Sequence, residues 1–358
     1  MSPASSLKVV ELAAVLAGPA VGMFFSELGA EVTKIENATT GGDMTRGWKL
    51  PSEPANWPYS AYFFSINWQK KHLFLDLSTP EGQAHTHALI READVVVSNF
   101  KPSSARKMRM DAPTLRALNE RLIFAQVQSF ADPEDESPAF DMVLQAEAGF
   151  MYINGAPGEP PVKMPVALID LLAAHQLKEA ILLALWQRER TGKGSTVSVS
   201  LLESALSSLA NQASNYLNTG YIPQPMGSRH PNIAPYGDVL YGADGQPLVL
   251  AVGTERQFER LCMALEVQHL LHDERFSVNS ERVKHRAALL EVLAEVMARR
   301  NAADTLNLLH QAGVPAARIR NMQEVMELPA AQAMILEEVL PDGTVSKRLK
   351  TNAFRIEE

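Results

Sequence analysis

The first 130 residues of this chain alternate between short apolar runs and segments with helical periodicity. The apolar runs predict buried strands, and the segments between them have the lengths of crossover connections. Strands are predicted at 7–12, 31–35, 73–77, 94–98 and 122–127, and helices at 18–28, 80–92 and 113–118. Gly29 follows the first of these helices, where a C-terminal glycine belongs. This alternation indicates an α/β fold with a parallel sheet covered on both faces.

The character of the chain changes after residue 218. Before that point the pattern predicts helices at 140–152, 171–190 and 201–217 and a strand at 195–199. Residues 220–235 hold four prolines and indicate a linker, and an Asp244-Gly245 turn then joins two short strands before a helical stretch at 255–312. We therefore predict a large domain at 1–224, a smaller α+β domain at 225–320, and a segment at 321–358 that returns to the large domain.

Charge and cysteine content exclude several classes of function. The formal net charge of −8 argues against nucleic acid as a partner, because phosphate binding requires a basic face. The single cysteine, Cys262, allows no disulfide within the chain. No stretch reaches the roughly 18 apolar residues of a membrane helix, and Glu11 interrupts the apolar run near the N-terminus. We expect a cytoplasmic protein that binds neither nucleic acid nor a membrane.

One acid, Asp170, is flanked on both sides by aliphatic residues, from Val166 to Leu172. A buried carboxylate is costly unless it is paired or hydrogen-bonded. Because the helical pattern begins at Leu171, Asp170 is predicted at or near a helix N-cap, where the dipole favours its charge. Two compatible interpretations follow: a capping residue, or a nucleophile that the cap geometry holds in one rotamer.

Several common cofactor and catalytic motifs are missing from the sequence. Gly18 and Gly22 follow the first strand four residues apart, without the G-x-G-x-x-G spacing of a nicotinamide site, although Glu36 ends the next strand where a ribose-binding acid would lie. The nine histidines are scattered, with no H-E-x-x-H motif or cysteine cluster, so no metal site is predicted. No G-x-S-x-G elbow occurs, so a serine hydrolase is not supported either.

Basic residues gather near two predicted strands. Lys101, Arg106, Lys107 and Arg109 follow the strand at 94–98, and Lys70-Lys71-His72 precede the strand at 73–77. Either these are solvated loop charges, or they bind phosphates. Asn99 and Phe100 beside the first group supply an amide and a ring of the kind that bind a purine.

These segments together resemble the family III CoA-transferases, which include formyl-CoA transferase and carnitine CoA-transferase. The matching segments follow the family's order over nearly the whole chain: Val15-Leu16-Ala17-Gly18-Pro19, 28–36, Gly42-Asp43-Met44-Thr45-Arg46, Lys70-Lys71 before Leu75-Asp76-Leu77, 93–102, 118–123, 188–194 and Arg229-His230-Pro231-Asn232. One such segment alone is weak evidence for the family, but the whole set in this order is specific to it.

The resemblance implies a Rossmann-like large domain, a smaller domain, and a homodimer of two chains threaded through each other as interlocked rings. It places the family's catalytic aspartate on Asp170 and an assisting acid on Asp141. CoA-binding positions fall near Asn99, Phe100 and Lys107, with Lys70 and Lys71 near the adenosine. The implied reaction moves CoA from an acyl-CoA to a free carboxylic acid through aspartyl anhydride and aspartyl-CoA thioester intermediates, with no permanently bound cofactor.

Two departures from formyl-CoA transferase lie near the expected CoA site: Leu16 replaces a glutamine and Asn37 replaces an arginine. They argue against oxalate and formyl-CoA as substrates. The alternative function is that of an α-methylacyl-CoA racemase, whose aspartate also falls on Asp170. Its histidine belongs directly before Asp141, where this chain has Phe140, a residue that carries no proton. The residues that we consider for the acyl pocket are Arg46, Trp48, Lys163 and His230.

Overall fold

The computed structural model describes residues 3–357, and the chain divides into two compact units. Unit 1 contains the residues up to Phe150, Lys163–Ile222 and the residues from Ala330 onward, and unit 2 contains Met151–Val162 and Pro223–Pro329. The boundary between Ile222 and Pro223 lies inside the proline-rich segment 220–235.

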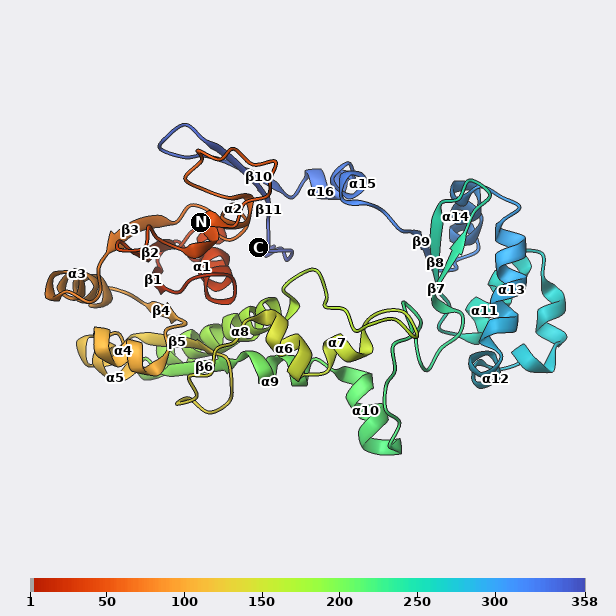
Figure 1. The fold of residues 1–358 in the computed structure, drawn as a ribbon, viewed down its shortest axis with the longest axis horizontal. Helices are drawn as coiled ribbons and strands as arrows, with labels where there is room; N and C mark the ends of the chain where they lie inside the picture. The colour runs from red at the N-terminus through yellow and green to blue at the C-terminus, as the bar shows by residue number, and fades with distance from the viewer. Residues whose placement is uncertain (1–2, 358) are drawn as a thin grey trace. The chain divides into compact units, whose positions relative to one another are not determined.

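Unit 1 is built on a six-stranded sheet (Figure 1). Its strands are β1 (Lys8–Leu12), β2 (Glu31–Asn37), β3 (Lys71–Leu75), β4 (Val95–Ser98), β5 (Ile123–Gln128) and β6 (Thr196–Ser200). They lie in the order β3-β2-β1-β4-β5-β6, and every neighbouring pair is parallel. The predicted α/β fold with a parallel sheet is therefore confirmed, and the strand order is that of a doubly wound Rossmann sheet.

Helices and a terminal hairpin complete unit 1. The helices are α1 (Ala17–Glu27), η1 (Met44–Gly47), α2 (Ala61–Phe64), α3 (Pro80–Ile90), α4 (Pro102–Met108), α5 (Ala112–Leu118), α6 (Asp141–Glu147), α8 (Leu168–Thr191), α9 (Leu201–Ser207) and α10 (Ala210–Thr219). Helix α7 (Phe150–Ile153) crosses the boundary between unit 1 and unit 2. Strands β10 (Ile335–Val339) and β11 (Val345–Leu349) pair antiparallel, and Arg348 of β11 forms a buried ion pair with Glu27 of α1 at 2.9 Å.

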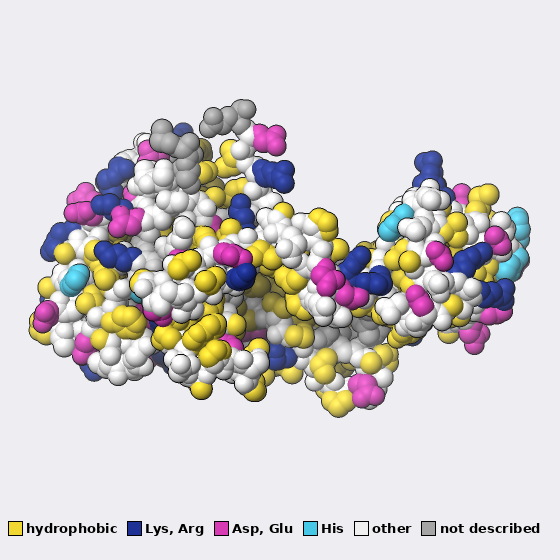
Figure 2. All heavy atoms as spheres, turned by 90° about the horizontal axis from the view of Figure 1, so that it is seen from above, with side chains coloured by type: hydrophobic (Ala, Val, Ile, Leu, Met, Phe, Trp, Pro, Cys, Tyr) yellow, Lys and Arg dark blue, Asp and Glu magenta, His cyan; other side chains and the backbone are white. Residues whose placement is uncertain are grey.

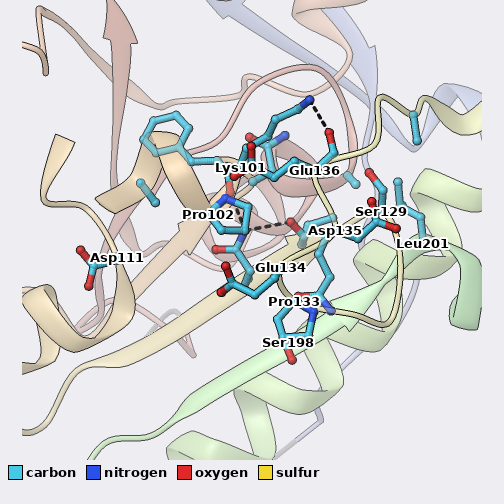
Figure 3. Close-up of a pocket in the computed structure, with 18 of the residues that line it drawn as sticks. Lys101, Pro102, Asp111, Ser129, Pro133, Glu134, Asp135, Glu136, Ser198 and Leu201 are labelled. Carbon is cyan, nitrogen blue, oxygen red and sulfur yellow. Dashed lines mark hydrogen bonds between the residues drawn. The ribbon is translucent and has the colours of Figure 1, made fainter. Parts of the chain in front are cut away.

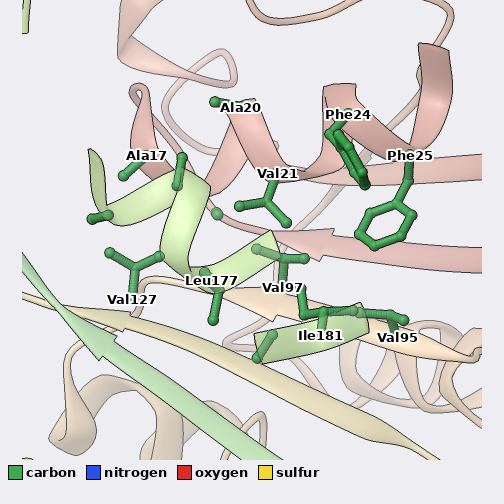
Figure 4. Packing of buried hydrophobic residues seen from close by; sticks show 14 of the residues in the cluster. Ala17, Ala20, Val21, Phe24, Phe25, Val95, Val97, Val127, Leu177 and Ile181 are labelled. Carbon is green, nitrogen blue, oxygen red and sulfur yellow. The ribbon is translucent and has the colours of Figure 1, made fainter. Parts of the chain in front are cut away.

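Alternate residues of the central strands point to opposite faces of the sheet and pack into two separate hydrophobic cores. On one face Val9, Val95, Val97, Ile123 and Ala125 pack against helices α1 and α8, as Figure 4 shows for part of the cluster. On the other face, neighbouring residues of the same strands pack against α3, α5 and the segments that follow them: Val10, Leu12, Val96 and Phe124 with Ile90, Met110 and Leu115. Burial on both faces explains why these strands read as unbroken apolar runs.

The boundaries of several elements differ from the prediction. The strand expected at 73–77 is Lys71–Leu75, because β3 is an edge strand whose register with β2 extends to the polar pair Lys71 and His72. The helix expected at 140–152 breaks after α6, where Gly149 has φ = +79°. The helix expected at 201–217 breaks at Ser208 into α9 and α10. The basic residues after β4 lie on and beside a helix, α4, that the sequence did not indicate.

The two glycines of the first crossover serve close packing of α1. A Cβ at Gly18 would overlap with the Cβ of Ala13, and one at Gly22 would overlap with Oε2 of Glu11. Residues at this spacing allow α1 to lie directly against the end of β1 and against the buried Glu11.

Unit 2 contains an antiparallel sheet in the order β7-β8-β9 and a set of helices. The strands are β7 (Tyr236–Tyr241), β8 (Pro247–Ala251) and β9 (Ala316–Arg318), and the helices are α11 (Glu255–Ala264), η2 (Gln268–His272), η3 (Glu274–Phe276), α12 (Asn279–Lys284), α13 (Arg286–Met297), α14 (Ala302–Gln311) and α15 (Met322–Met326). Helix α16 (Pro329–Gln332) lies at its boundary with unit 1. The turn predicted at Asp244-Gly245 joins β7 and β8, and the core includes Leu248, Phe258 and Leu293.

Charged side chains of both signs are mixed over the face of each unit that Figure 2 shows. Between residues 3 and 357, no helix has the length and apolar character needed to cross a membrane.

Candidate functional site

A cavity of about 560 Å³ lies in unit 1 at the carboxyl ends of the central strands. Its walls include the turn after β1, from Ala14 to Ala17, and Asn99 and Phe100 after β4. Strands β1 and β4 are the neighbours at which the strand order reverses. In open parallel sheets this switch point is where ligands bind.

Asp170 lies in the wall of this cavity. It is 9% exposed, and among residues 3–357 no donor hydrogen-bonds its carboxylate. Burial, and then the neighbouring charge of Asp141, raise the pKa of Asp170 to about 7. A buried carboxylate without donors holds its charge weakly and is poised to react with a group in the cavity.

The capping role that we considered for Asp170 belongs to Asp141. Helix α8 begins at Leu168, so Asp170 lies inside its first turn and not at the N-cap. Oδ1 of Asp141 accepts hydrogen bonds from the backbone N–H groups of Ile169 (2.7 Å) and Asp170 (3.4 Å), and its Oδ2 accepts one from Gln145 Nε2 (2.6 Å). Asp141 is the first residue of α6, so the contact fixes the starts of two helices against each other.

The backbone donors at the start of α8 are occupied. Besides the two N–H groups held by Asp141, Leu168 donates to the Val166 carbonyl and Leu171 to the Ala167 carbonyl. The start of α1 differs: within the part of the chain that the structure describes, the N–H groups of Leu16 and Ala17 meet no acceptor. Both residues line the cavity with Asp170. Unpaired backbone donors are therefore found in cavity-lining residues at the start of α1, whereas those at the start of α8 are paired.

Replacing Asp141 by asparagine is expected to lower the pKa of Asp170. The amide keeps an oxygen for the N–H groups of Ile169 and Asp170 but removes the negative charge that opposes ionisation of Asp170. Titration of the Asp170 carboxyl by ¹³C NMR measures the change. Glu147→Gln, which removes an exposed charge from the same helix, is the matched control; equal pKa values in both variants would contradict the assignment.

The structure brings some of the predicted CoA-binding residues to the cavity and not others. Leu16, Asn99 and Phe100 line it. The amide of Asn99 is already paired with the backbone of Ala14, which accepts at 2.8 Å and donates at 3.2 Å, so Asn99 fixes the turn and has its main hydrogen-bonding groups occupied. Lys107 is exposed on α4 and lies outside the cavity wall. Asn37 also lies outside it, with its side chain bonded to Thr39.

The two lysines that we expected near the adenosine have different surroundings. Lys70 is 7% exposed, and its ammonium group lies 2.8 Å from Glu11, 2.9 Å from the Pro19 carbonyl and 3.1 Å from Asn67 Oδ1. An ammonium has three hydrogens, so Lys70 has no donor left for a ligand in this arrangement. Lys71 is exposed at the start of the edge strand β3 and does not line the cavity.

An acidic loop covers the cationic side of the cavity. We call residues 132–138 the acidic strap; its Glu134 pairs with Arg106 through two hydrogen bonds of 3.0 Å, and Glu136 accepts from Ser103 N and Oγ at 2.6 and 2.8 Å. Lys101 donates to the Glu136 carbonyl (Figure 3). The strap therefore occupies groups on α4 that are suited to bind an anion.

The four residues considered for the acyl pocket are placed in different environments. Arg46 forms a bidentate pair with Glu36 and stacks over Phe63, so its charge is compensated. Trp48 is half-exposed and makes an edge contact with Tyr62. Lys163 donates to the carbonyls of Met164 and Pro165 in the segment entering α8. His230 belongs to unit 2, where burial and Arg286 lower its pKa.

Two groups near the site were given no role by the sequence, although Asp43 lies in one of the segments that resemble the family. Burial, and then the charges of Asp170, Asp141 and Asp43, raise the pKa of Tyr62 to about 12, which keeps its hydroxyl protonated close to the cavity acid. The second group is Asp43, which bonds to the backbone of Val15 in the cavity wall. No set of three or more His, Cys, Asp or Glu side chains within residues 3–357 is arranged to hold a metal ion.

Comparisons with known proteins identify the family of this chain. The model of CoA-transferase family III matches residues 5–357. The succinate–glutarate CoA-transferase of Agrobacterium fabrum is 38% identical over 98% of this chain and 88% of its own length, and the human succinyl-CoA:glutarate CoA-transferase is 30% identical over 92% and 74%.

Solved structures give the same result. A CaiB/BaiF family protein from Brucella suis superposes with a TM-score of 0.85 and 38% identity, covering all of this chain and 93% of that one. A Mycobacterium tuberculosis protein superposes with a TM-score of 0.84 and 27% identity over 99% and 93%. The chain belongs to CoA-transferase family III and is an acyl-CoA:carboxylate CoA-transferase.

Proposed function

We propose that this enzyme transfers CoA from succinyl-CoA to a five-carbon dicarboxylic acid such as glutarate, with Asp170 as the nucleophile. The observation that carries the proposal is the Asp170 carboxylate: it is nine-tenths buried, meets no hydrogen-bond donor in the described part of the chain, and lies in the wall of a cavity at the switch point of the sheet. The choice of substrates rests on the relatives from Agrobacterium fabrum and human, whose names specify succinate or succinyl-CoA and glutarate.

In the proposed reaction, each half transfer uses the same carboxylate. Asp170 attacks the thioester carbonyl of the donor; a C–O bond forms, the C–S bond breaks, and CoA leaves as a thiolate. The thiolate then attacks the Asp170 carbonyl of the anhydride, which releases the donor acid and leaves an aspartyl-CoA thioester. The acceptor carboxylate displaces the thiolate from this thioester, and the thiolate attacks the acceptor carbonyl of the second anhydride. Acyl-CoA product forms and Asp170 is regenerated with no net proton change.

Two features of the cavity suit these steps. The N–H groups of Leu16 and Ala17 are positioned to stabilise the oxyanions that form at each attack. Asp141 holds the backbone N–H groups of Ile169 and of Asp170, which lie directly before the Asp170 Cα, and so limits the positions that the Asp170 carboxylate can take. We assign Asp170 the nucleophilic role and Asp141 a positioning role.

We assign the CoA end of the substrate to the part of the cavity between Phe100 and α4. Phe100 is half-buried in the wall and offers a ring on which the adenine can stack. Arg106 and Lys101 of the same wall offer charges for the phosphates. Lys71 and Lys107 are exposed on neighbouring elements. We still predict that they contribute to the positive electrostatic field around the CoA end of the substrate.

Phe140 bears on the alternative, a racemase. It lines the cavity and precedes α6, so the position at which a racemase needs a proton-carrying side chain holds a phenyl ring. The comparisons give that alternative no support: the relatives reported above are CoA-transferases.

The homodimer of interlocked chains stays a prediction. Large apolar side chains exposed on α8, among them Leu183 (65%) and Trp186 (62%), favour burial by a second copy. Light scattering of the purified enzyme tests it.

Removing charge from the acidic strap is expected to strengthen acyl-CoA binding. The Arg106–Glu134 pair is exposed, so solvent screening makes it weak, and the CoA phosphates can displace the carboxylate. Glu134→Gln should lower the KM for succinyl-CoA by about two- to five-fold at low salt, and less at high salt. Glu120→Gln, an exposed charge outside the cavity, is the control. A KM that is unchanged in Glu134→Gln, or equally changed in the control, contradicts this role.

The proposed function is tested by assaying succinyl-CoA against a series of free acids. We expect glutaryl-CoA and succinate in equal amounts when glutarate is the acceptor, and little transfer to monocarboxylic acids of the same length. Equal rates with both classes would contradict the dicarboxylate assignment, and hydrolysis without transfer would contradict the function itself.

A further inference from the structure

The turn between β1 and α1 contains a strained backbone position. Val15 has φ = +74°, a left-handed conformation that β-branched residues rarely adopt. Such a residue persists only where its surroundings hold it, and positions of this kind are concentrated at functional sites. Val15 lies in the cavity wall between Ala14 and Leu16, next to the N–H groups of Leu16 and Ala17, which meet no acceptor among residues 3–357.

Three polar side chains hold the backbone of this turn, one at each residue; Lys34 and Asp43 are buried and Asn99 is half-buried. Lys34 donates to the carbonyl of Ala13 at 2.6 Å. Asn99 bonds to both the N–H and the carbonyl of Ala14. The carboxylate of Asp43 accepts from the N–H of Val15, at 3.2 Å to Oδ2 and 3.4 Å to Oδ1. Local sequence therefore does not maintain the turn; distant strands and loops do.

Asp43 is itself fixed on several sides. Its Oδ1 accepts from Thr45 N at 3.0 Å and from Thr45 Oγ1 at 2.8 Å, and its own N–H donates to Glu36 at 2.7 Å. Its Oδ2 lies 3.0 Å from Lys34 Nζ, and the Asp43 side chain has no exposed surface. The carboxylate is thus held by bonds that leave it one orientation, facing Val15.

The charge of Asp43 belongs to a balanced buried cluster. Lys34 also pairs with Glu11 at 2.7 Å, and Glu11 pairs with Lys70 at 2.8 Å. Two carboxylates therefore face two ammonium groups in a region where an uncompensated charge is strongly destabilising. Lys34 connects the cluster to both ends of the turn, because it bonds the Ala13 carbonyl and the Asp43 carboxylate that holds Val15.

We propose that Asp43, together with Lys34, is a positioning residue for CoA transfer: it holds Val15 in its left-handed conformation and so keeps the Leu16 and Ala17 N–H groups in the cavity beside Asp170. The inference rests on the proposed function, because it takes the acyl carbonyl to meet these groups. It assigns the buried cluster of Glu11, Lys34, Asp43 and Lys70 to catalysis through the backbone rather than through contact with CoA.

The single change Asp43→Asn tests the role directly. An amide NH2 in place of Oδ2 would set its hydrogens against Lys34 and the Val15 N–H, and one in place of Oδ1 would set them against the Thr45 N–H, so either orientation opposes a donor to a donor. We expect kcat to fall by about 10- to 100-fold, somewhat below the loss from removing one oxyanion donor outright, with the KM for succinyl-CoA changed less than about three-fold. Asp76→Asn, which removes a carboxylate from the turn after β3 outside the cavity, should leave both constants unchanged.

A charge-balanced variant separates positioning from stability. Asp43→Asn leaves one ammonium unpaired, whereas Lys34→Met combined with Asp43→Asn leaves Glu11 and Lys70 as one pair. The double variant should therefore unfold at a higher temperature than Asp43→Asn while its kcat stays low. Recovery of kcat in parallel with the unfolding temperature would overturn the proposal in favour of a structural role alone.

Glycine at position 15 supplies a rescue. Glycine adopts positive φ without strain, so Val15→Gly removes much of the need for a clamp. In the Asp43→Asn background, Val15→Gly should raise kcat at least five-fold and leave KM unchanged, because it restores an interaction that acts in the transition state and not in substrate binding. Hydrogen exchange of the Val15 amide gives an independent readout: slow in the wild type and fast in Asp43→Asn. Wild-type kcat in Asp43→Asn, slow exchange there, or no rescue by glycine would each overturn the inference.

Failure of this inference is distinguishable from failure of the proposed function. If Asp170→Asn is inactive while the Asp43 variants behave as wild type, the nucleophile stands and the clamp is wrong. If Asp170→Asn retains transfer, the proposed function is wrong, and the hydrogen-exchange experiment still reports whether Asp43 holds the turn.

Discussion

Asp170→Asn is expected to abolish CoA transfer, lowering kcat by at least about 10⁴-fold, the order of loss that follows removal of a nucleophile. The amide is nearly the same size as the carboxylate but does not form the anhydride. Because no donor among residues 3–357 bonds the Asp170 carboxylate, the substitution breaks no hydrogen bond within the described part of the chain. Succinyl-CoA binding should stay within a few-fold of the wild type, as measured by calorimetry.

The control for this variant is Asp141→Asn, which keeps the nucleophile and should retain far more activity. Comparable turnover in Asp170→Asn and the wild type would contradict the role of Asp170. A loss of succinyl-CoA binding as large as the loss of kcat would instead place Asp170 in substrate binding.

The second large effect is the pH dependence that follows from the pKa of Asp170. Only the carboxylate attacks a thioester, and burial together with Asp141 raises this pKa to about 7. We expect kcat/KM for succinyl-CoA to be constant above pH 8 and to fall about ten-fold per pH unit below 7, so that it is about 100-fold lower at pH 5. In Asp141→Asn, the pH below which kcat/KM falls should be lower than in the wild type. A fall that begins only near pH 4 in the wild type would contradict the burial of the Asp170 charge.

The same pKa predicts the sign of a stability effect. The native state binds a proton at Asp170 up to about pH 7, whereas the unfolded chain releases it near pH 4. The cost of ionising Asp170 in the native state is therefore absent below pH 4, grows between pH 4 and 7, and is constant above. Asp170→Asn has no such cost, so its unfolding temperature should exceed that of the wild type at pH 8 and match it near pH 4. Calorimetric scans at both pH values measure this difference.

Local patterns were sufficient for the layout of unit 1. Strands that are buried on both faces, such as Val95–Ser98, are apolar runs in the sequence, and the helices between them predict a parallel sheet. Gly18 and Gly22 of α1 could be identified in the sequence, but the reason for glycine at these positions could not. A Cβ at Gly22 would overlap with Glu11, and Glu11 is held there by an ion cluster assembled from four separate segments.

The site was harder to predict, because its determinants are contacts between distant residues. Asp170 was identified from its apolar flanks, but the cap of its helix comes from Asp141, 29 positions earlier. Lys70 looked like a ligand-binding lysine, since the sequence does not show that Glu11 meets it in the core. Likewise the acidic strap gave no sign that Glu134 would pair with Arg106, or that the Glu136 carboxylate would accept from Ser103 of α4.

The measurement that tests the central claim most directly is the intact mass of the enzyme after incubation with succinyl-CoA, followed by trapping with hydroxylamine or borohydride and peptide mapping. The account predicts a covalent adduct on the peptide that contains Asp170, absent from Asp170→Asn. Continuing turnover with no adduct on that peptide, or an adduct at another residue, would contradict transfer through the Asp170 carboxylate.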